Sequence, residues 1–223
     1  MARSFRVTAL VLAFGAATAV EAQTIDFTAT NGGFTAQSIT GSNPWTWSAG
    51  TGWVVNSSAT VARQRLLSPV LVATGGAFSI SATHRYNFES ALPTGCFDGG
   101  VVFASINGGA FNALAPTSGK GYDGPIVSGF SNPLAGQNAF CGNQSAANVI
   151  STWAGSLAAG TTIQIALDGA WDSSVTTTNP NWNLRAVTLS GLNVIPEPST
   201  YALMATGLAG LAALRRRKAK TTA

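Results

Sequence analysis

Between about residue 24 and residue 194, short apolar runs alternate with segments rich in Gly, Asn, Pro and Ser. In residues 78–82, Phe-Ser-Ile-Ser-Ala, and in residues 163–167, Ile-Gln-Ile-Ala-Leu, large apolar side chains recur at every second position. This period of two is typical of a strand that packs one face against the core and exposes the other. Asn107-Gly108-Gly109 is a hairpin-turn signal. The predicted strands are 53–55, 70–72, 77–85, 100–106, 152–157, 161–167 and 184–192.

Two antiparallel sheets packed face to face would bury the apolar faces of these strands. The pattern therefore predicts an all-β fold, a jelly-roll-like antiparallel β-sandwich. The composition agrees, because 46% of residues are hydrophobic, only 9% are charged and 25 are glycine. Such values are typical of short strands and many turns. The 223 residues have room for one domain after both ends are set aside, which we place at residues 23–194.

The first 22 residues have the order of a secretory signal peptide. Arg3 and Arg6 precede an apolar run over residues 7–20, and Val20-Glu21-Ala22 offers a small-residue cleavage site. We expect cleavage after Ala22. The alternative is an uncleaved N-terminal anchor, but the apolar run is short for a segment that must cross about 30 Å of hydrocarbon.

Residues 195–223 combine a stiff acidic tripeptide, an apolar run and a basic end. Pro196 and Pro198 hold Glu197 in an extended segment that cannot join a strand. Residues 201–214 are uncharged and predict a short transmembrane helix with its N-terminus outside. The charges that stop transfer on the cytoplasmic side are Arg215, Arg216 and Arg217.

This order resembles the PEP-CTERM sorting signal of Gram-negative bacteria. The resemblance implies recognition of Pro196, Glu197 and Pro198 by an exosortase, which removes the tail. The other implied partners are the secretion machinery, signal peptidase and, transiently, the inner membrane. The implied destination is the cell surface or extracellular matrix. The alternative is a plain C-terminal anchor that is never processed.

The charge distribution argues against nucleic-acid binding. The net charge of +4 comes from the two ends, whereas residues 24–195 contain five basic and six acidic residues. A nucleic-acid-binding surface needs clustered Lys and Arg to displace counterions from phosphates. We therefore attribute the sequence pI of about 9.5 to targeting.

A second resemblance covers most of the region between the ends. Its motifs are residues 67–71, 81–89, 98–102, 105–109, 132–136 and 166–168, followed by Trp182. In this order they resemble the jelly-roll domains of MAM or concanavalin-like type in bacterial exoproteins. The resemblance implies a binding or accessory module, with a structural metal in some members.

Cys96 and Cys141 are the only cysteines of the chain. Export places them in an oxidising compartment, so we expect one disulfide. A bridge of this size is typically worth about 2–4 kcal/mol. The alternative is a pair of free thiols.

Four acidic or titratable side chains are candidates for chemistry. Glu89, Asp98 and Asp168 carry the oxygen ligands that Ca²⁺ prefers, if they converge at one rim of the sandwich. The alternative is that they are solvated or paired with arginines, Arg85 or Arg185. His84 is the only histidine, and no nucleophile-elbow or His-Glu-x-x-His motif accompanies it, which favours a structural role. No cofactor other than a structural Ca²⁺ is indicated.

Trp45, Trp47 and Trp53 are separated by even numbers of residues, so they share parity and would lie on one face of an extended chain. An exposed pair of Trp45 and Trp47 would stack on sugar rings, whereas large aromatic side chains more often fill the core of a sandwich. Both alternatives stay open from the sequence.

Together these features predict a non-catalytic, exported binding or scaffolding protein, associated with exopolysaccharide. One alternative is a secreted carbohydrate-active hydrolase that uses Glu89 and Asp98. The other is a purely structural coat protein.

Overall fold

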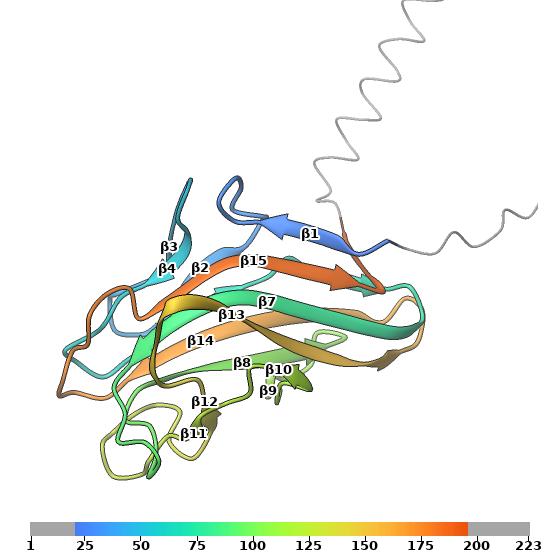
Figure 1. Ribbon diagram of the computed structural model, residues 1–223. Coiled ribbons are helices and arrows are strands. Elements are labelled where there is room, and N and C mark those ends of the chain that lie inside the picture. The colour runs from blue at the N-terminus through green and yellow to red at the C-terminus, as the bar shows by residue number, and fades with distance from the viewer. Residues whose placement is uncertain (1–20, 196–223) are drawn as a thin grey trace, which may run out of the picture.

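The computed structural model describes residues 21–195, which form two facing β-sheets (Figure 1). The strands of the first sheet are β1 (Gln23–Asp26), β3 (Thr46–Ser48), β4 (Gly52–Val55), β7 (Gly76–Phe88), β10 (Ser118–Gly119), β13 (Gly142–Leu157) and β15 (Trp182–Ser190). Those of the second are β2 (Thr35–Thr40), β5 (Ala62–Leu67), β6 (Leu71–Ala73), β8 (Gly99–Ile106), β9 (Asn112–Ala113), β14 (Thr162–Trp171) and β16 (Leu192–Val194). A separate small pair consists of β11 (Gly124–Pro125) and β12 (Asn138–Ala139).

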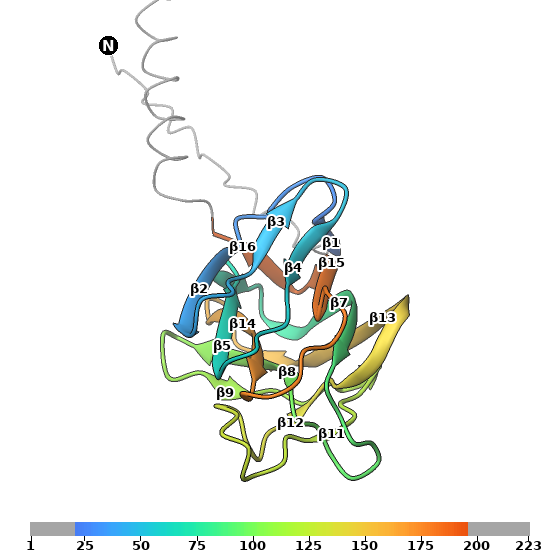
Figure 2. The same cartoon turned by 90° about the vertical axis from the view of Figure 1, so that its left-hand side faces the viewer.

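Neighbouring strands run antiparallel in both sheets. The first sheet has the order β10-β13-β7-β15-β4-β3, with β1 beside β15. The second has the order β16-β6-β14-β5-β2, and β8 pairs with both β14 and β9. Figure 2 shows the two layers from the side, with β7 and β13 in one and β2 and β5 in the other. The predicted all-β, jelly-roll-like sandwich is confirmed.

The core lies between the sheets and is rich in aromatic side chains. Along β7, alternate residues from Ile80 to Phe88 are buried, as the period of two predicts. Trp171 and Trp182 are fully buried, and the Phe88 ring contacts both. Such aromatic contacts favour tilted or edge-to-face geometries and add to the burial of apolar area.

The predicted strands correspond to observed ones, but several differ in extent. Two are longer than predicted, since 77–85 continues to Phe88 in β7 and 161–167 continues to Trp171 in β14. The predicted strand 152–157 is only the last part of β13, which begins at Gly142. The predicted strand 184–192 is interrupted at Gly191, where β15 leaves the first sheet and β16 enters the second. Gly191 has a φ of 68°, and a Cβ there would lie 2.3 Å from the Ala77 carbonyl oxygen, so only glycine fits. The predicted turn at Asn107 joins β8 to β9.

Strand β5 was missed because its pattern does not look amphipathic. Its buried face contains Gln64, and its other face contains Arg63 and Arg65. The Gln64 side chain is satisfied inside the fold, since it accepts a hydrogen bond from Ser38 Oγ (2.7 Å) and donates one to the Thr40 carbonyl (2.7 Å). A polar side chain with both partners supplied by β2 can therefore replace an apolar one.

The two ends of the described chain leave the sandwich on the same side (Figure 1). The predicted signal peptide, residues 1–22, lies outside the described residues except for its last two positions, and the Pro-Glu-Pro segment with its helix and arginines lies outside them entirely. Within residues 21–195, no helix is long and apolar enough to cross a bilayer.

Candidate functional site

Three carboxylates meet at the end of the sandwich that is remote from Ile195. Glu89 follows the last residue of β7, Asp98 precedes the first residue of β8, and Asp172 follows the last residue of β14. One oxygen from each lies within 4.8 Å of the others. The site is thus built where three strand ends converge, a position that the sheet pairing fixes.

The three carboxylates are poorly compensated by the protein itself. Asp98 and Asp172 are only 1% and 2% exposed. Glu89 Oε2, Asp98 Oδ2 and Asp172 Oδ2 are each buried without a hydrogen-bond partner among the described residues. A buried polar group left in this state typically costs about 1–3 kcal/mol, and more when it is charged. Within residues 21–195, no basic side chain forms an ion pair with the cluster.

The other oxygens of the two aspartates are held by backbone groups. Asp98 Oδ1 accepts a hydrogen bond from the Asp172 N–H (2.9 Å). Asp172 Oδ1 accepts bonds from the N–H and hydroxyl of Ser174 (2.9 and 3.0 Å). These contacts fix the orientation of both carboxylates and leave one oxygen of each free for a ligand.

The electrostatics of the cluster also favour a cation. Burial raises the pKa of Asp98 to about 8, and the charges of Asp172 and Glu89 act in the same direction, against the hydrogen bond from the Asp172 N–H. Burial and the neighbouring Asp172 likewise raise the pKa of Glu89 above its ordinary value. A cation bound between the three groups would favour their ionised forms and relieve this repulsion.

The donor set fits a hard divalent cation. Carboxylate oxygens are the ligands that Ca²⁺ and Mg²⁺ prefer, and the cluster contains neither a thiolate nor an imidazole. The half-buried Glu89 and the two buried aspartates supply at least three oxygens, and Ca²⁺ takes six to eight in flexible geometry. The site can hold such an ion.

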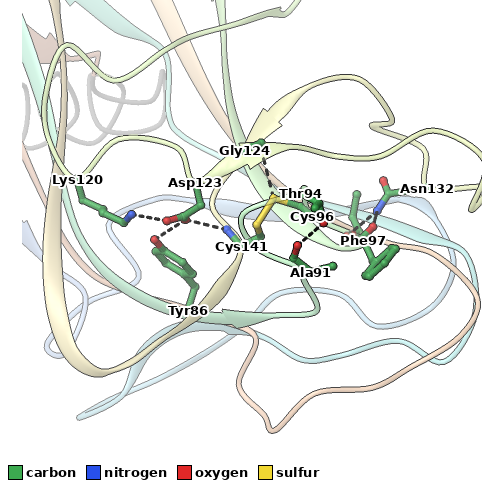
Figure 3. The surroundings of a disulfide bond; sticks show 11 residues. Tyr86, Ala91, Thr94, Cys96, Phe97, Lys120, Asp123, Gly124, Asn132 and Cys141 are labelled. Carbon is green, nitrogen blue, oxygen red and sulfur yellow. Dashed lines mark hydrogen bonds and ion pairs between the residues drawn. A yellow bond between two sulfur atoms is a disulfide. The ribbon is translucent and has the colours of Figure 1, made fainter.

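The predicted disulfide between Cys96 and Cys141 is confirmed, with the two Cα atoms 5.7 Å apart. It ties the segment leading to Asp98 to the residue before β13 (Figure 3). Beside it, the Cys141 N–H donates to Asp123 Oδ2 (3.0 Å), which also accepts the Tyr86 hydroxyl (2.8 Å). The alternative of two free thiols is wrong.

Asn132 connects the backbone on both sides of the cluster. Its Nδ2 donates to the carbonyls of Phe97 (2.9 Å) and Ala170 (3.2 Å), and its Oδ1 accepts the Leu134 N–H (2.9 Å). Phe97 immediately precedes Asp98, and Ala170 lies two residues before Asp172. The side chain is buried, so it positions two of the three carboxylates through their backbones.

Asp168, predicted as the third ligand, lies elsewhere and is replaced by Asp172. Its carboxylate is fully buried on the outer face of the second sheet, between Arg63 (2.6 Å) and Arg65 (2.8 Å). These arginines, and not Arg85 or Arg185, are its partners. The apolar run ends at residue 167, but β14 continues to Trp171, so the end of the strand moves from Asp168 to Asp172. The apolar run alone does not indicate this extension. The sequence signal for Asp172 is Ser174, two residues later, which bonds to its carboxylate.

His84 belongs to the core. Its Nδ1 accepts the Trp182 indole N–H (3.1 Å), which places the proton on Nε2, and Nε2 lies 2.9 Å from Ser151 Oγ. Ser151 in turn donates to the Lys120 carbonyl (2.6 Å). Burial lowers the pKa of His84 to about 3, so the ring is neutral and both nitrogens are used structurally.

The tryptophans do not form the exposed stacking face that their spacing allows. Trp45 is 2% exposed, its ring lies 5.4 Å from that of Trp182, and its Nε1 donates to the Gln64 carbonyl (3.3 Å). Trp47 is half-buried and pairs across the β3–β4 hairpin with Trp53. The chain reverses between these two residues, so parity along an extended chain does not apply, and Trp45 cannot serve as a sugar platform.

Comparison with known proteins identifies the tail and places the fold. Residues 194–218 match the family described as the PEP-CTERM protein-sorting motif, which confirms the interpretation of the tail and marks an exported protein. No curated protein matches the chain.

Among solved structures, the C-terminal CBM6 of a marine laminarinase from Zobellia galactanivorans is 14% identical, with a TM-score of 0.34, covering 76% of this chain and 99% of that one. The CBM35 from Cellvibrio japonicus is 14% identical, with a TM-score of 0.39 and coverages of 79% and 99%. A family 35 carbohydrate binding module from Clostridium thermocellum is 12% identical, with a TM-score of 0.35 and coverages of 75% and 98%. These are not MAM or concanavalin-like domains, and scores this low establish neither a ligand nor a residue role for this chain.

Proposed function

We propose that this protein is delivered by exosortase processing to the cell surface or extracellular matrix of a Gram-negative bacterium, where its β-sandwich serves as a non-catalytic polysaccharide-binding module. The observation that carries the sorting part of the proposal is the junction between the fold and the sorting motif. β16 ends at Val194, and the motif match begins at the same residue. The domain is therefore attached to its sorting signal without a linker.

This junction suits removal of the tail. β16 is paired with β6 along its whole length, from Leu192 with Ala73 to Val194 with Leu71. A cut at or after Pro196 would break none of these pairings, so the released domain would keep its last strand. In this proposal signal peptidase acts first, the inner membrane holds the tail briefly, and the exosortase then reads Pro196, Glu197 and Pro198.

We assign calcium to Glu89, Asp98 and Asp172 as a structural cation. Its role would be to join the end of β7, the start of β8 and the end of β14, and to neutralise carboxylates that have no positive partner in the described part of the chain. The ligands are all carboxylate oxygens, which favour calcium over softer metals. The buried oxygens without partners support the presence of a cation.

The geometry favours binding over hydrolysis. Glycosidases place two carboxyl groups on either side of the scissile bond, about 5–5.5 Å apart when retaining and about 6.5–9.5 Å apart when inverting. Here one oxygen of Glu89 and one of Asp98 lie within 4.8 Å of each other and of an oxygen of a third acid, Asp172, and both aspartates are buried. A third acid and the burial of both aspartates suit a bound cation better than attack on a sugar linkage, which supports a non-catalytic role.

The proposal is tested by following the full chain in cells with and without the exosortase. We expect a shortened form in the matrix fraction of wild-type cells, and a longer form retained in the inner membrane when the exosortase gene is deleted or Glu197 is changed to Gln. The matrix form should co-sediment with the native exopolysaccharide and be released when that polymer is digested. Correct sorting without any retention by the polymer would instead favour a purely structural coat protein.

A further inference from the structure

A polar groove lies at the same end of the sandwich as the carboxylate cluster. It has a volume of about 330 Å³, within the range of small-ligand sites. Its wall on the first sheet is formed by the outward-facing residues at the end of β7 and by the start of β13. Its other wall is the loop between β14 and β15. The polar side chains that line it are Arg85, Asn87, Asn143, Ser145, Thr178 and Asn179.

An irregularity in β13 leaves this groove open. Gln144 pairs with Tyr86 and Val149 pairs with His84, so four residues of β13 stand opposite Arg85 alone. A bulge of this kind turns the strand aside and re-aims side chains. It removes the neighbour that would otherwise cover the Arg85 side chain.

The loop wall is held in place by hydrogen bonds to Asn87. Its carbonyl accepts bonds from Thr177 Oγ1 (2.6 Å) and Asn181 Nδ2 (2.8 Å), and its Nδ2 donates to the Thr178 carbonyl (3.2 Å). Asn179 is fixed by the Ser57 N–H, which donates to its Oδ1 (2.7 Å). The groove is thus pre-organised, which limits the entropy lost when a ligand binds.

Arg85 supplies the only charge in the lining. Its Nε donates to Asn183 Oδ1 (3.1 Å), which fixes the direction of the guanidinium. Within the part of the chain that the structure describes, Arg63 and Arg65 pair with Asp168, and Lys120 pairs with Asp123, whereas Arg85 has no carboxylate partner. A held guanidinium without a counter-ion, in a groove lined by no acid, is suited to a planar anion.

We propose that this groove binds an acidic saccharide, with the carboxylate of a uronic acid on Arg85 and the sugar hydroxyls on the surrounding amide and hydroxyl side chains. The planar fork of arginine matches a carboxylate, and amides both donate to and accept from hydroxyls. The inference rests on the proposed polysaccharide-binding function and names its ligand class and its site.

The groove also faces away from the sorting tail. Ser79 of β7 pairs with Ser190 near the tail, whereas Tyr86, which lines the groove, pairs with Trp182 at the opposite end of β15. β14 contains ten residues, so about 30 Å separate the two ends of the sandwich. The groove thus lies at the end of the domain opposite the sorting tail, where neither the tail nor the inner membrane that holds it would cover the groove.

The test is affinity electrophoresis of the full chain, extracted in mild detergent, in gels containing alginate, dextran or dextran sulfate. We expect retardation by alginate, a polyuronate, and none by neutral dextran. Arg85→Gln should weaken alginate binding about tenfold to hundredfold, because a hydrogen-bonded pair with a charged group is worth about 1.5–3 kcal/mol. Arg85→Lys, which keeps the charge and loses the fork, should give an intermediate loss.

Two matched controls separate the groove from net charge. Arg185→Gln removes the same charge from a side chain that bonds to the Gly50 and Thr51 carbonyls, and should leave alginate binding unchanged. If Arg85→Gln fails to fold, Asn143→Asp places a negative charge, of the same sign as the ligand, on the wall that carries Arg85, with almost no change in shape. It should weaken binding, whereas Asn193→Asp on the exposed face of β16 should not.

If the wild type, Arg85→Gln and Arg185→Gln all bind alginate equally well, the groove assignment is overturned. The proposed function would still stand. Retardation by dextran alone, or by dextran sulfate alone, would overturn the uronate chemistry in the same way. Failure to bind all three polymers would overturn the inference. The proposed function would then stand or fall on co-sedimentation with the native exopolysaccharide.

Discussion

Calcium should stabilise the folded domain, and the effect should depend on Asp98. The carboxylate cluster has three buried oxygens without partners, so the folded state gains far more from a bound cation than the unfolded chain does. At a calcium concentration about 100 times the Kd, this linkage contributes about 2.7 kcal/mol. For a domain of this size, about 1 kcal/mol shifts the Tm by about 2–4 °C, which gives a rise of about 5–11 °C.

Thermal unfolding in calcium and in EGTA measures this shift directly. Asp98→Asn should abolish the response, whereas Asp26→Asn, at an exposed site far from the cluster, should keep it. In EGTA at pH 8 we expect Asp98→Asn to be more stable than the wild type, because it removes a buried charge that repels Asp172 and Glu89. In calcium the order should reverse.

Equal Tm values in calcium and EGTA would show that the cluster holds no calcium. A full calcium response in Asp98→Asn would place the ion elsewhere on the protein. Either result would refute the reasoning from the orphaned oxygens.

Four further predictions concern the buried charges and the cross-link. In EGTA the free energy of unfolding should fall as pH rises from about 6.5 to about 8, by up to about 1.4 kcal/mol per pH unit, because the raised pKa of Asp98 makes the folded state hold a proton that the unfolded chain has released; a urea titration over this range should become flat when calcium is added. His84 acts with the opposite sign at lower pH, since its pKa of about 3 means that in calcium stability is lost as the pH falls below about 6.5, and His84→Gln should flatten that acid limb of the calcium titration. Changing Cys141 to Ser should cost about 2–4 kcal/mol in urea unfolding under oxidising conditions and nothing further under reducing ones, whereas an equal loss in both would exclude the cross-link as its cause. Asp168→Asn should lower the free energy of unfolding by about 3–5 kcal/mol, because it removes the ion-pair partner of two arginines on the outer face. It does not touch the cluster, so the calcium response should stay intact, and loss of that response would contradict our placement of the site.

The period-two pattern was sufficient to predict the class of fold and most of the long strands. Residues 78–82 and 163–167 alternate because one face of each sheet meets the core and the other does not. The disulfide was also predictable, because export and an even number of cysteines leave little alternative. The tail was the most specific feature of all, since its three elements occur in a fixed order.

The candidate site could be predicted only in part. Glu89 and Asp98 flank two predicted strands, so their approach at one rim followed from the topology of a sandwich. The third ligand did not, because β14 continues through Gly169 and Ala170, whose small side chains do not look like a strand in isolation. Pairing with β5 and β8 extends the strand there, and tertiary contacts of this kind are not visible in local sequence.

The groove could not be predicted from sequence at all. It depends on the interruption of β13 after Gln144 and on a loop that hydrogen bonds to Asn87, and neither has a local signature. The role of Arg85 is equally hidden, because its lack of a carboxylate partner appears only when Arg63 and Arg65 are seen to share Asp168.

Mass determination of both termini of the protein, recovered from the extracellular matrix, tests the account most directly. We predict a polypeptide that begins at Gln23, keeps Val194 and ends before the apolar run of residues 201–214. Recovery of the intact chain of 223 residues from the cytosol, with none in the matrix, would contradict it.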